Sequence, residues 1–126
     1  MKKLVWAVIV LIIFVASSFA IEAKLKQSVD SMLLKIQELT NNLKNENWNY
    51  VDTSFEEMVN IWEEKGKVWS VIIDHNEIDQ LTIALYKSKT FANYREKEEA
   101  LAELKQFEFM VDHIPKIHKL ELKNIL

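Results

Sequence analysis

The chain begins with a long apolar segment. Residues 4–21 read LVWAVIVLIIFVASSFAI and carry no charge. As a helix this stretch would span about 27 Å, close to the thickness of the hydrocarbon core of a bilayer. It could be a transmembrane anchor that stays in the mature chain. It could also be a cleaved signal peptide, with Lys2 and Lys3 as the basic start and a small-x-small cleavage site (SFA) at residues 18–20.

A heptad pattern follows the apolar segment directly. Large apolar side chains recur at alternating steps of four and three, which is the pattern of a helix packed along one seam. Traced backwards, the seam reaches Ile21 and Ser18 without a break in phase. The pattern therefore predicts one helix that runs from the membrane into the domain, and it favours the anchor over the signal peptide. The seam residues are Leu25, Val29, Met32, Ile36, Leu39 and Leu43.

Asparagines mark the end of this helix and the start of a second one. Residues 41–47 contain four of them, and after glycine Asn is the residue best suited to end one helix and cap the next. Gly66 lies within the apolar stripe of the second helix, which predicts the close approach of a neighbouring helix. A second stripe of Ile61, Val68 and Ile72 predicts that the end of this helix is covered on two sides. The first stripe comprises Trp48, Val51, Phe55, Met58, Val59, Trp62, Trp69 and Ile73.

The segment WSVIIDHNEIDQL, residues 69–81, predicts a junction between helices. The stripe that ends at Ile73 and the stripe that begins at Ile78 differ in phase by about 120°, so a straight helix could not bury both against one partner. Asp74 is a good N-cap residue, and Glu77 completes an acidic capping box three positions later. Ile73 and Ile78 occupy the two positions of a hydrophobic staple around that cap.

Two further helices complete the pattern. The third is expected to run to about Ser88, with residues 89–92 as a bridge and with Asn93 and Glu96 as the cap of the fourth. The fourth is expected to end at Pro115, which lacks an N–H and disfavours helical geometry in the residue before it. The stripe of the fourth helix comprises Ala100, Leu104, Phe107, Val111 and Ile114.

The composition supports a fold built of helices. The chain has 126 residues with one glycine, one proline and no cysteine, which leaves few tight turns and excludes disulfides and thiolate chemistry. We predict an all-α fold, in which an N-terminal membrane helix continues into an antiparallel bundle of about four helices. Residues 1–21 would form the anchor or signal peptide, and residues 22–126 an extracytoplasmic bundle domain. Stacked hairpins of the tetratricopeptide type are the alternative, although the chain is too short for three such units.

The charge distribution narrows the range of partners. All 19 acidic residues and 14 of the 16 Lys and Arg residues lie beyond residue 21, so residues 22–126 carry a net charge of about −5. This is a poor electrostatic match for nucleic acid. It also disfavours a domain that lies flat on an anionic lipid surface.

Eight residues in and around the junction form the candidate functional or architectural cluster. A calcium loop that started at Asp74 would place Ile78 and Leu85 where Asp or Asn and Glu are required, so this match fails. His75 and Asp79 share a helix face, but two ligands do not make a zinc site, and a third would have to come from across the bundle. The cluster comprises Trp62, Trp69, Asp74, His75, Asn76, Glu77, Asp79 and His113.

The alternative interpretation is that the residues of this cluster have structural rather than functional roles. Trp62 and Trp69 lie at helical spacing, which is more typical of a core than of a ligand pocket, and Asn and Asp near the junction could accept from their indole N–H groups. His113 would lie in the last turn of the fourth helix, where a cation suits the helix dipole. There is no G-x-S-x-G elbow or glycine-rich loop. We therefore expect no enzymatic activity, and we assign no catalytic, cofactor or metal-binding residue.

A series of short motifs gives the chain a resemblance. They are NENW (45–48), two tryptophans with six residues between them (62–69), DHNEID (74–79), ALAEL (100–104), HIP (113–115) and LxLKNIL (120–126). In this order they resemble an uncharacterised family of short, N-terminally membrane-anchored proteins of Gram-positive, mostly spore-forming bacteria, which is known only as a domain of unknown function. The resemblance implies a membrane-tethered helical domain that faces outward, and it brings no activity or cofactor.

The sequence thus leads to a principal functional hypothesis with two alternatives. The principal one is a single-pass protein of the cytoplasmic membrane, held in the bilayer by residues 4–21 with its N-terminus inside. Its outer bundle would bind another protein, for which an integral membrane protein is a candidate. The acidic faces and the apolar tail Ile117–Leu126 would be its docking elements. The first alternative is a small-ligand pocket between Trp62, Trp69, His75 and the fourth helix. The second is a metal-dependent site around His75 and Asp79. If the N-terminal segment were cleaved, the protein would be secreted, and the sequence assigns no oligomeric state.

Overall fold

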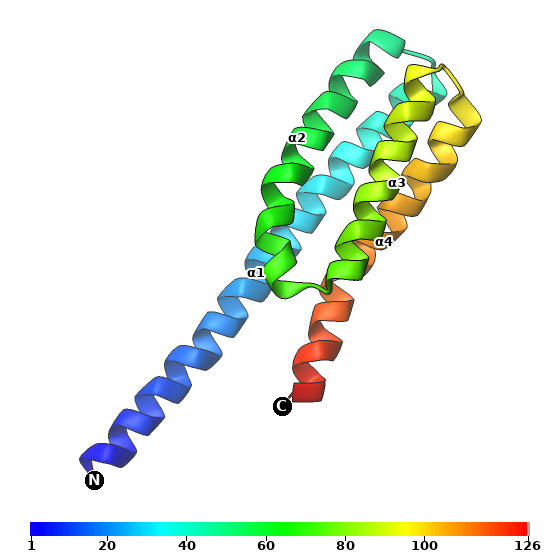
Figure 1. The fold of residues 1–126 in the computed structure, drawn as a ribbon. Helices are drawn as coiled ribbons and strands as arrows, with labels where there is room; N and C mark the ends of the chain where they lie inside the picture. Colours follow the sequence, from blue (N-terminus) through cyan, green and yellow to red (C-terminus); the bar gives the residue numbers. More distant parts are fainter. Residues whose placement is uncertain (126) are drawn as a thin grey trace.

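The computed structural model describes the backbone of residues 1–125 and the side chains of residues 1–116. Within these residues the chain forms four helices and no strand (Figure 1): α1 (Lys2–Lys44), α2 (Trp48–Ile72), α3 (His75–Asn93) and α4 (Lys97–Ile125). Successive helices run antiparallel and pack side by side, and α4 also packs against α1, which closes the bundle. The predicted all-α class and the antiparallel bundle of about four helices are confirmed.

The first helix belongs to the bundle along only part of its length. All six residues of its heptad seam are buried, none of them more than 4% exposed. The helix is unbroken, as predicted, and its N-terminal part extends away from the other three helices (Figure 1). That part contains an 18-residue window with a mean hydropathy of 2.8, of which 0% is buried. By length and composition, α1 is therefore able to cross a membrane.

The turn from α1 to α2 ends the first helix in the predicted region. The Asn47 N–H donates to the Asn42 carbonyl at 3.0 Å and the Glu46 N–H donates to the Leu43 carbonyl at 3.2 Å, which together form a Schellman motif. The left-handed position of this motif is held by Glu46, with φ of 57°. Asn45 and Asn47 therefore flank this position, but the left-handed residue itself is a glutamate.

The end of α3 differs from the prediction. Residues 89–92 are helical rather than a bridge, and Asn93 is the last residue of α3 rather than the cap of α4. The reason is that small residues continue the buried face of the helix: Ser88 and Ala92 are both 0% exposed. The Ser88 hydroxyl donates to the Ala100 carbonyl of α4 at 2.7 Å, which satisfies the polar group in the core.

Proline 115 does not end the fourth helix, which corrects a second prediction. The helix continues through Pro115 to Ile125, although the proline removes the hydrogen bond to the carbonyl of Val111. Ile114 is 1% exposed, and Pro115 lines a groove with Leu25 and Val29 of α1. The burial of Ile114 in the core and the packing of Pro115 beside α1 therefore outweigh the local preference of the proline.

The second face of α2 is not covered within the described part of the chain. Val68 is 62% exposed, and only Ile61 and Ile72 of the predicted stripe pack partly against the core. A Cβ atom added at Gly66 would meet nothing within 4 Å. Both the expected two-sided burial and the expected close approach of a helix at Gly66 are therefore wrong. The first stripe is confirmed, with every member buried except the partly buried Trp48.

Candidate functional site

The polar cluster at residues 74–79 forms the start of α3. The chain is extended at Ile73, with φ −117° and ψ 147°, and the helix begins at His75 with Asp74 at the N-cap position. The Asp74 carbonyl accepts the N–H groups of Glu77 and Ile78 at 3.1 and 3.2 Å. The predicted junction and the position of its cap are confirmed.

The predicted acidic capping box is wrong in its side-chain hydrogen bonding. The Asp74 side chain makes no capping hydrogen bond, and it lies exposed at the surface together with His75, Asn76 and Asp79. Glu77 still places a negative charge in the first turn, where it favours the helix dipole. Ile73 and Ile78 are 4% and 8% exposed and belong to the same core. The hydrophobic staple therefore accounts for more of the junction than the carboxylates do.

The two tryptophans of the cluster are core residues. Trp62 and Trp69 are 2% and 3% exposed, and their rings meet edge to face with centroids 5.5 Å apart. The Trp62 ring also meets Phe107 of α4 edge to face, at 5.6 Å. The indole N–H of Trp62 donates to Thr82 Oγ1 at 2.8 Å, so its acceptor is a threonine rather than the Asn or Asp expected. Both rings are therefore engaged in packing between helices.

His113 lies in the middle of a helix rather than in its last turn, because α4 continues beyond it. Its ring is half-buried, stacks on Phe109 with centroids 4.2 Å apart and places Nδ1 3.0 Å from the Phe109 carbonyl. Across the residues that the structure describes, no group of three or more His, Asp or Glu side chains is arranged to hold a metal ion.

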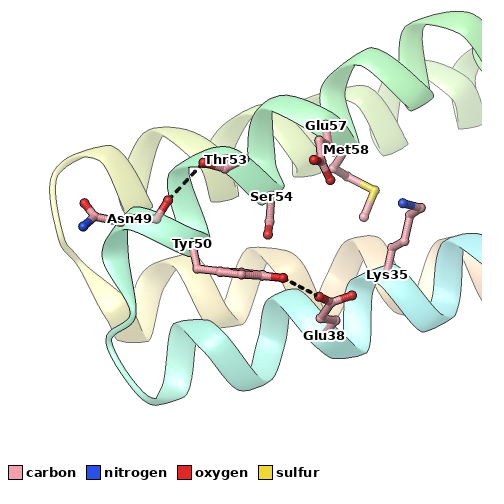
Figure 2. Close-up of a pocket in the computed structure, with 8 residues that line it drawn as sticks. All are labelled: Lys35, Glu38, Asn49, Tyr50, Thr53, Ser54, Glu57 and Met58. Atoms are coloured by element: carbon pink, nitrogen blue, oxygen red, sulfur yellow. Dashed lines mark hydrogen bonds between the residues drawn. The ribbon is translucent and has the colours of Figure 1, made fainter.

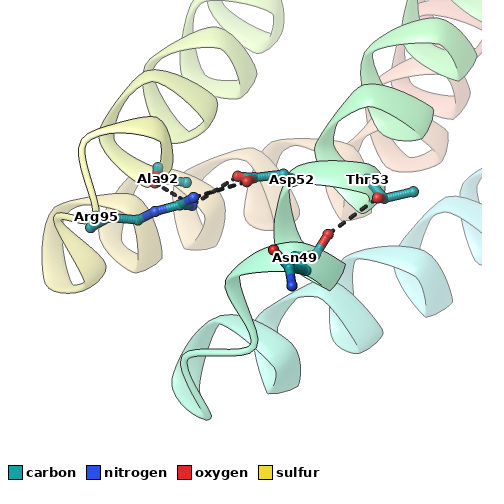
Figure 3. A network of polar contacts seen from close by, with 5 residues as sticks. All are labelled: Asn49, Asp52, Thr53, Ala92 and Arg95. Carbon is teal, nitrogen blue, oxygen red and sulfur yellow. Dashed lines mark hydrogen bonds and ion pairs between the residues drawn. The ribbon is translucent and has the colours of Figure 1, made fainter.

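A second cluster lies at the opposite end of the bundle, in the turn between α3 and α4 (Figure 3). Arg95 adopts φ of 62°, and its Nη1 and Nη2 donate to the two carboxylate oxygens of Asp52 at 2.9 and 3.0 Å. Nη1 also reaches the Ala92 carbonyl at 3.4 Å, and the guanidinium carbon lies 4.9 Å from the centroid of Trp48. The hydrogen-bonded Asp52 carboxylate raises the pKa of Arg95 above its ordinary value.

This arginine links the first turns of α2 to the turn before α4. Sequence reasoning missed it, since a non-glycine residue in the left-handed region has no composition signal, and the nearby Asn93-x-x-Glu96 pattern pointed to a helix cap instead. Its bidentate hydrogen bonds hold the turn between α3 and α4 against the first turns of α2. We therefore assign Arg95 an architectural role.

A polar groove runs between α1 and α2 near the same end (Figure 2). The Tyr50 hydroxyl of α2 donates to Glu38 of α1 at 3.3 Å, and the Thr53 hydroxyl donates to the Asn49 carbonyl at 3.1 Å. Lys35 and Glu57 flank the groove from the two helices. The walls carry both signs of charge.

Taken together, these features define an all-helical bundle carried on a long N-terminal helix, in which the polar cluster at residues 74–79 forms a helix junction. The chain belongs to the family described as a domain of unknown function, DUF4363, whose model matches residues 19–125. The resemblance to an uncharacterised domain family is thereby confirmed. Comparison with curated proteins and with solved structures finds no match.

Proposed function

We propose that this protein is a single-pass membrane protein, whose residues 4–21 cross the cytoplasmic membrane and whose bundle stands on the outer face as an accessory module for another membrane protein. The division of α1 supports the proposal. Thirteen large apolar side chains between Leu4 and Ile21 are each at least 41% exposed, whereas the seam from Leu25 onward is buried. Leaving side chains of this kind in water forfeits about 1.5–3 kcal/mol each, so this part of the helix requires an apolar environment.

The orientation follows from the two ends of the apolar segment. Lys2, Lys3 and the terminal amine precede it, and positive charge next to a membrane helix favours the cytoplasmic side. Lys24 and Lys26 follow it, so the excess of positive charge on the N-terminal side is the terminal amine. We therefore place the N-terminus inside and the bundle outside.

A partner role is supported by apolar side chains that the bundle leaves at its surface. Leu34 of α1 and Phe109 of α4 are 68% and 62% exposed. Phe109 lines a groove between α1 and α4 together with Leu33, and aromatic side chains in such positions are frequent anchors in protein interfaces. The tail Ile117–Leu126, predicted as a docking element, has side chains outside the described residues, although its backbone continues α4 to Ile125.

Photo-crosslinking in native membranes tests the partner role. A benzophenone amino acid would replace Phe109, and a matched control would carry it at Ile83, which is 54% exposed on α3. The proposal expects a discrete crosslink to one membrane protein from position 109 and none from position 83. If both positions give the same crosslinks, or if neither gives any while the chain remains in the membrane, the accessory role on this face is wrong.

Deletion of residues 116–126 gives a second, independent test. If the tail docks onto the partner, the truncated protein should lose the crosslinked protein while its melting temperature barely changes. If the tail packs on its own bundle, the melting temperature should fall markedly. A deletion that alters neither property would exclude both roles for the tail.

A further inference from the structure

An apolar groove lies between α1 and α2, on the side where α1 leaves the bundle. Val71 and Val68 of α2 are 87% and 62% exposed along it, and Ile21 of α1 is 45% exposed. These three residues, with Ile72, Lys24 and Lys67, are called the proximal edge below. The full lining of the groove is Ile21, Lys24, Leu25, Ser28, Lys67, Val68, Trp69, Val71 and Ile72.

The exposure of Val71 follows from the way α2 ends. Trp69 and Ile73 turn into the core, at 3% and 4% exposed, so the residue midway between them must face outward. The β-branched run of residues 71–73 is a weak helix former. It places an aliphatic side chain outside the bundle at the point where the chain turns into α3.

The groove lies at the level where the apolar segment ends. Ile21 is both the last residue of that segment and part of the lining, and Leu25, the first residue of the buried seam, lies about 6 Å further along the helix at 1.5 Å per residue. The interfacial layer of a bilayer extends about 5–7 Å beyond the hydrocarbon core on each side. If residues 4–21 fill the hydrocarbon, the proximal edge stands in this layer.

The charges of the edge fit the same surroundings. Its lining contains Lys24 and Lys67 and no acidic residue, although residues 22–126 as a whole carry a net charge of about −5 by the count of 14 basic and 19 acidic residues. Lysine stems can lie along apolar surface while their ammonium groups reach polar phosphates. The bundle as a whole is repelled by an anionic surface, but this one edge of it is not.

We propose that the proximal edge rests in the interfacial layer of the outer leaflet, with Val68 and Val71 at the acyl boundary and Lys24 and Lys67 on lipid phosphates. The inference rests on the proposed function, because the anchor sets the height of the edge. It adds a second contact between protein and bilayer, which fixes the tilt and rotation of the bundle above the membrane.

The absence of cysteine from the chain allows a direct test. Three full-length variants, Val71→Cys, Ile83→Cys and Leu11→Cys, would each carry one environment-sensitive fluorophore and be reconstituted in phosphatidylcholine–phosphatidylglycerol vesicles. A fraction of the lipids would carry a nitroxide at a shallow acyl position. Position 83 is the matched control, 54% exposed on α3 outside the groove, and position 11 reports on the anchor.

The proposal expects nitroxide lipids to quench the labels at positions 11 and 71 several-fold more than the label at position 83. It also expects Lys24→Gln with Lys67→Gln to reduce the quenching at position 71 alone. Equal, weak quenching at positions 71 and 83, with position 11 quenched, would overturn the inference and leave the anchor intact. A label at position 71 that is shielded from aqueous iodide but not quenched by lipid would mean that protein covers the edge, which also overturns it. An unquenched label at position 11 would overturn the anchor itself and this inference with it.

Discussion

The indole N–H of Trp62 donates to the Thr82 hydroxyl at 2.8 Å, and the same hydroxyl donates to the Ile78 carbonyl at 2.8 Å. This relay joins the middle of α2 to the first turns of α3. Trp62 also packs edge to face on Trp69 of α2 and Phe107 of α4. Thr82 therefore fixes the orientation of an indole ring that contacts α3 and α4.

Removal of that hydroxyl should destabilise the bundle. Thr82→Val keeps the shape of the side chain but leaves the buried indole N–H without an acceptor, a loss of about 1–3 kcal/mol in the free energy of unfolding. Thr82→Ser keeps the hydroxyl and is the control. Urea unfolding of the full chain in detergent micelles would measure both, and equal stability of Thr82→Val and the parent would show that the relay contributes nothing.

The open surroundings of Gly66 give a prediction of opposite sign. Its place in the interior of α2 costs helix stability, and no neighbouring atom lies within 4 Å of an added Cβ. Gly66→Ala should therefore raise the free energy of unfolding by about 0.5–1 kcal/mol. Thermal melting would check this, with Gly66→Leu as a larger probe of the same space. A fall in the melting temperature of the alanine variant would indicate that a helix does approach at this position.

The contact between Tyr86 and Glu63 predicts a change in stability at alkaline pH. The phenol donates to Glu63 Oε1 at 2.8 Å, and this hydrogen bond, with smaller contributions from burial and from the negative charge of Glu63, raises the pKa of Tyr86. The folded chain thus favours the neutral phenol. The stabilisation is fully present below the unfolded pKa of about 10 and is lost as the pH rises through the higher folded value.

Tyr86→Phe should therefore lower the melting temperature most at neutral pH and progressively less at alkaline pH, until the two proteins converge. The difference in absorbance of the ionised phenols between the parent and Tyr86→Phe would show Tyr86 titrating later than a free tyrosine. A difference between the two proteins that stayed constant across the alkaline range would show that the hydrogen bond does not control this titration.

The parts of the fold that the sequence revealed are those built from large aliphatic residues at regular steps. Leu25, Val29 and their partners in α1 are buried as the heptad predicted, and the phase change at Ile73 located the junction. In α3 the same reasoning failed, because Ser88 and Ala92 continue the buried face with small side chains that a hydrophobic pattern does not register.

Other features depend on tertiary packing that local sequence does not contain. Pro115 is helical because it lies against Leu25 and Val29 of α1, next to the buried Ile114. Val68 and Val71 are apolar yet exposed, and periodicity alone does not show whether an apolar side chain meets a neighbouring helix. The acceptor for the indole N–H of Trp62 lies twenty positions away on another helix. The role of Arg95 depends on its left-handed backbone conformation, which the sequence pattern does not indicate.

The membrane topology of the chain is the central claim, and thiol labelling in intact cells tests it most directly. Each of two full-length variants, Lys3→Cys and Ile83→Cys, would carry the only thiol in the chain and be exposed to a membrane-impermeant maleimide. The account predicts that position 83 is labelled in intact cells and position 3 only after permeabilisation, with both proteins in the membrane fraction at full-length mass. Protection of position 83 in intact cells, or a mature chain that starts at Ile21, would contradict it.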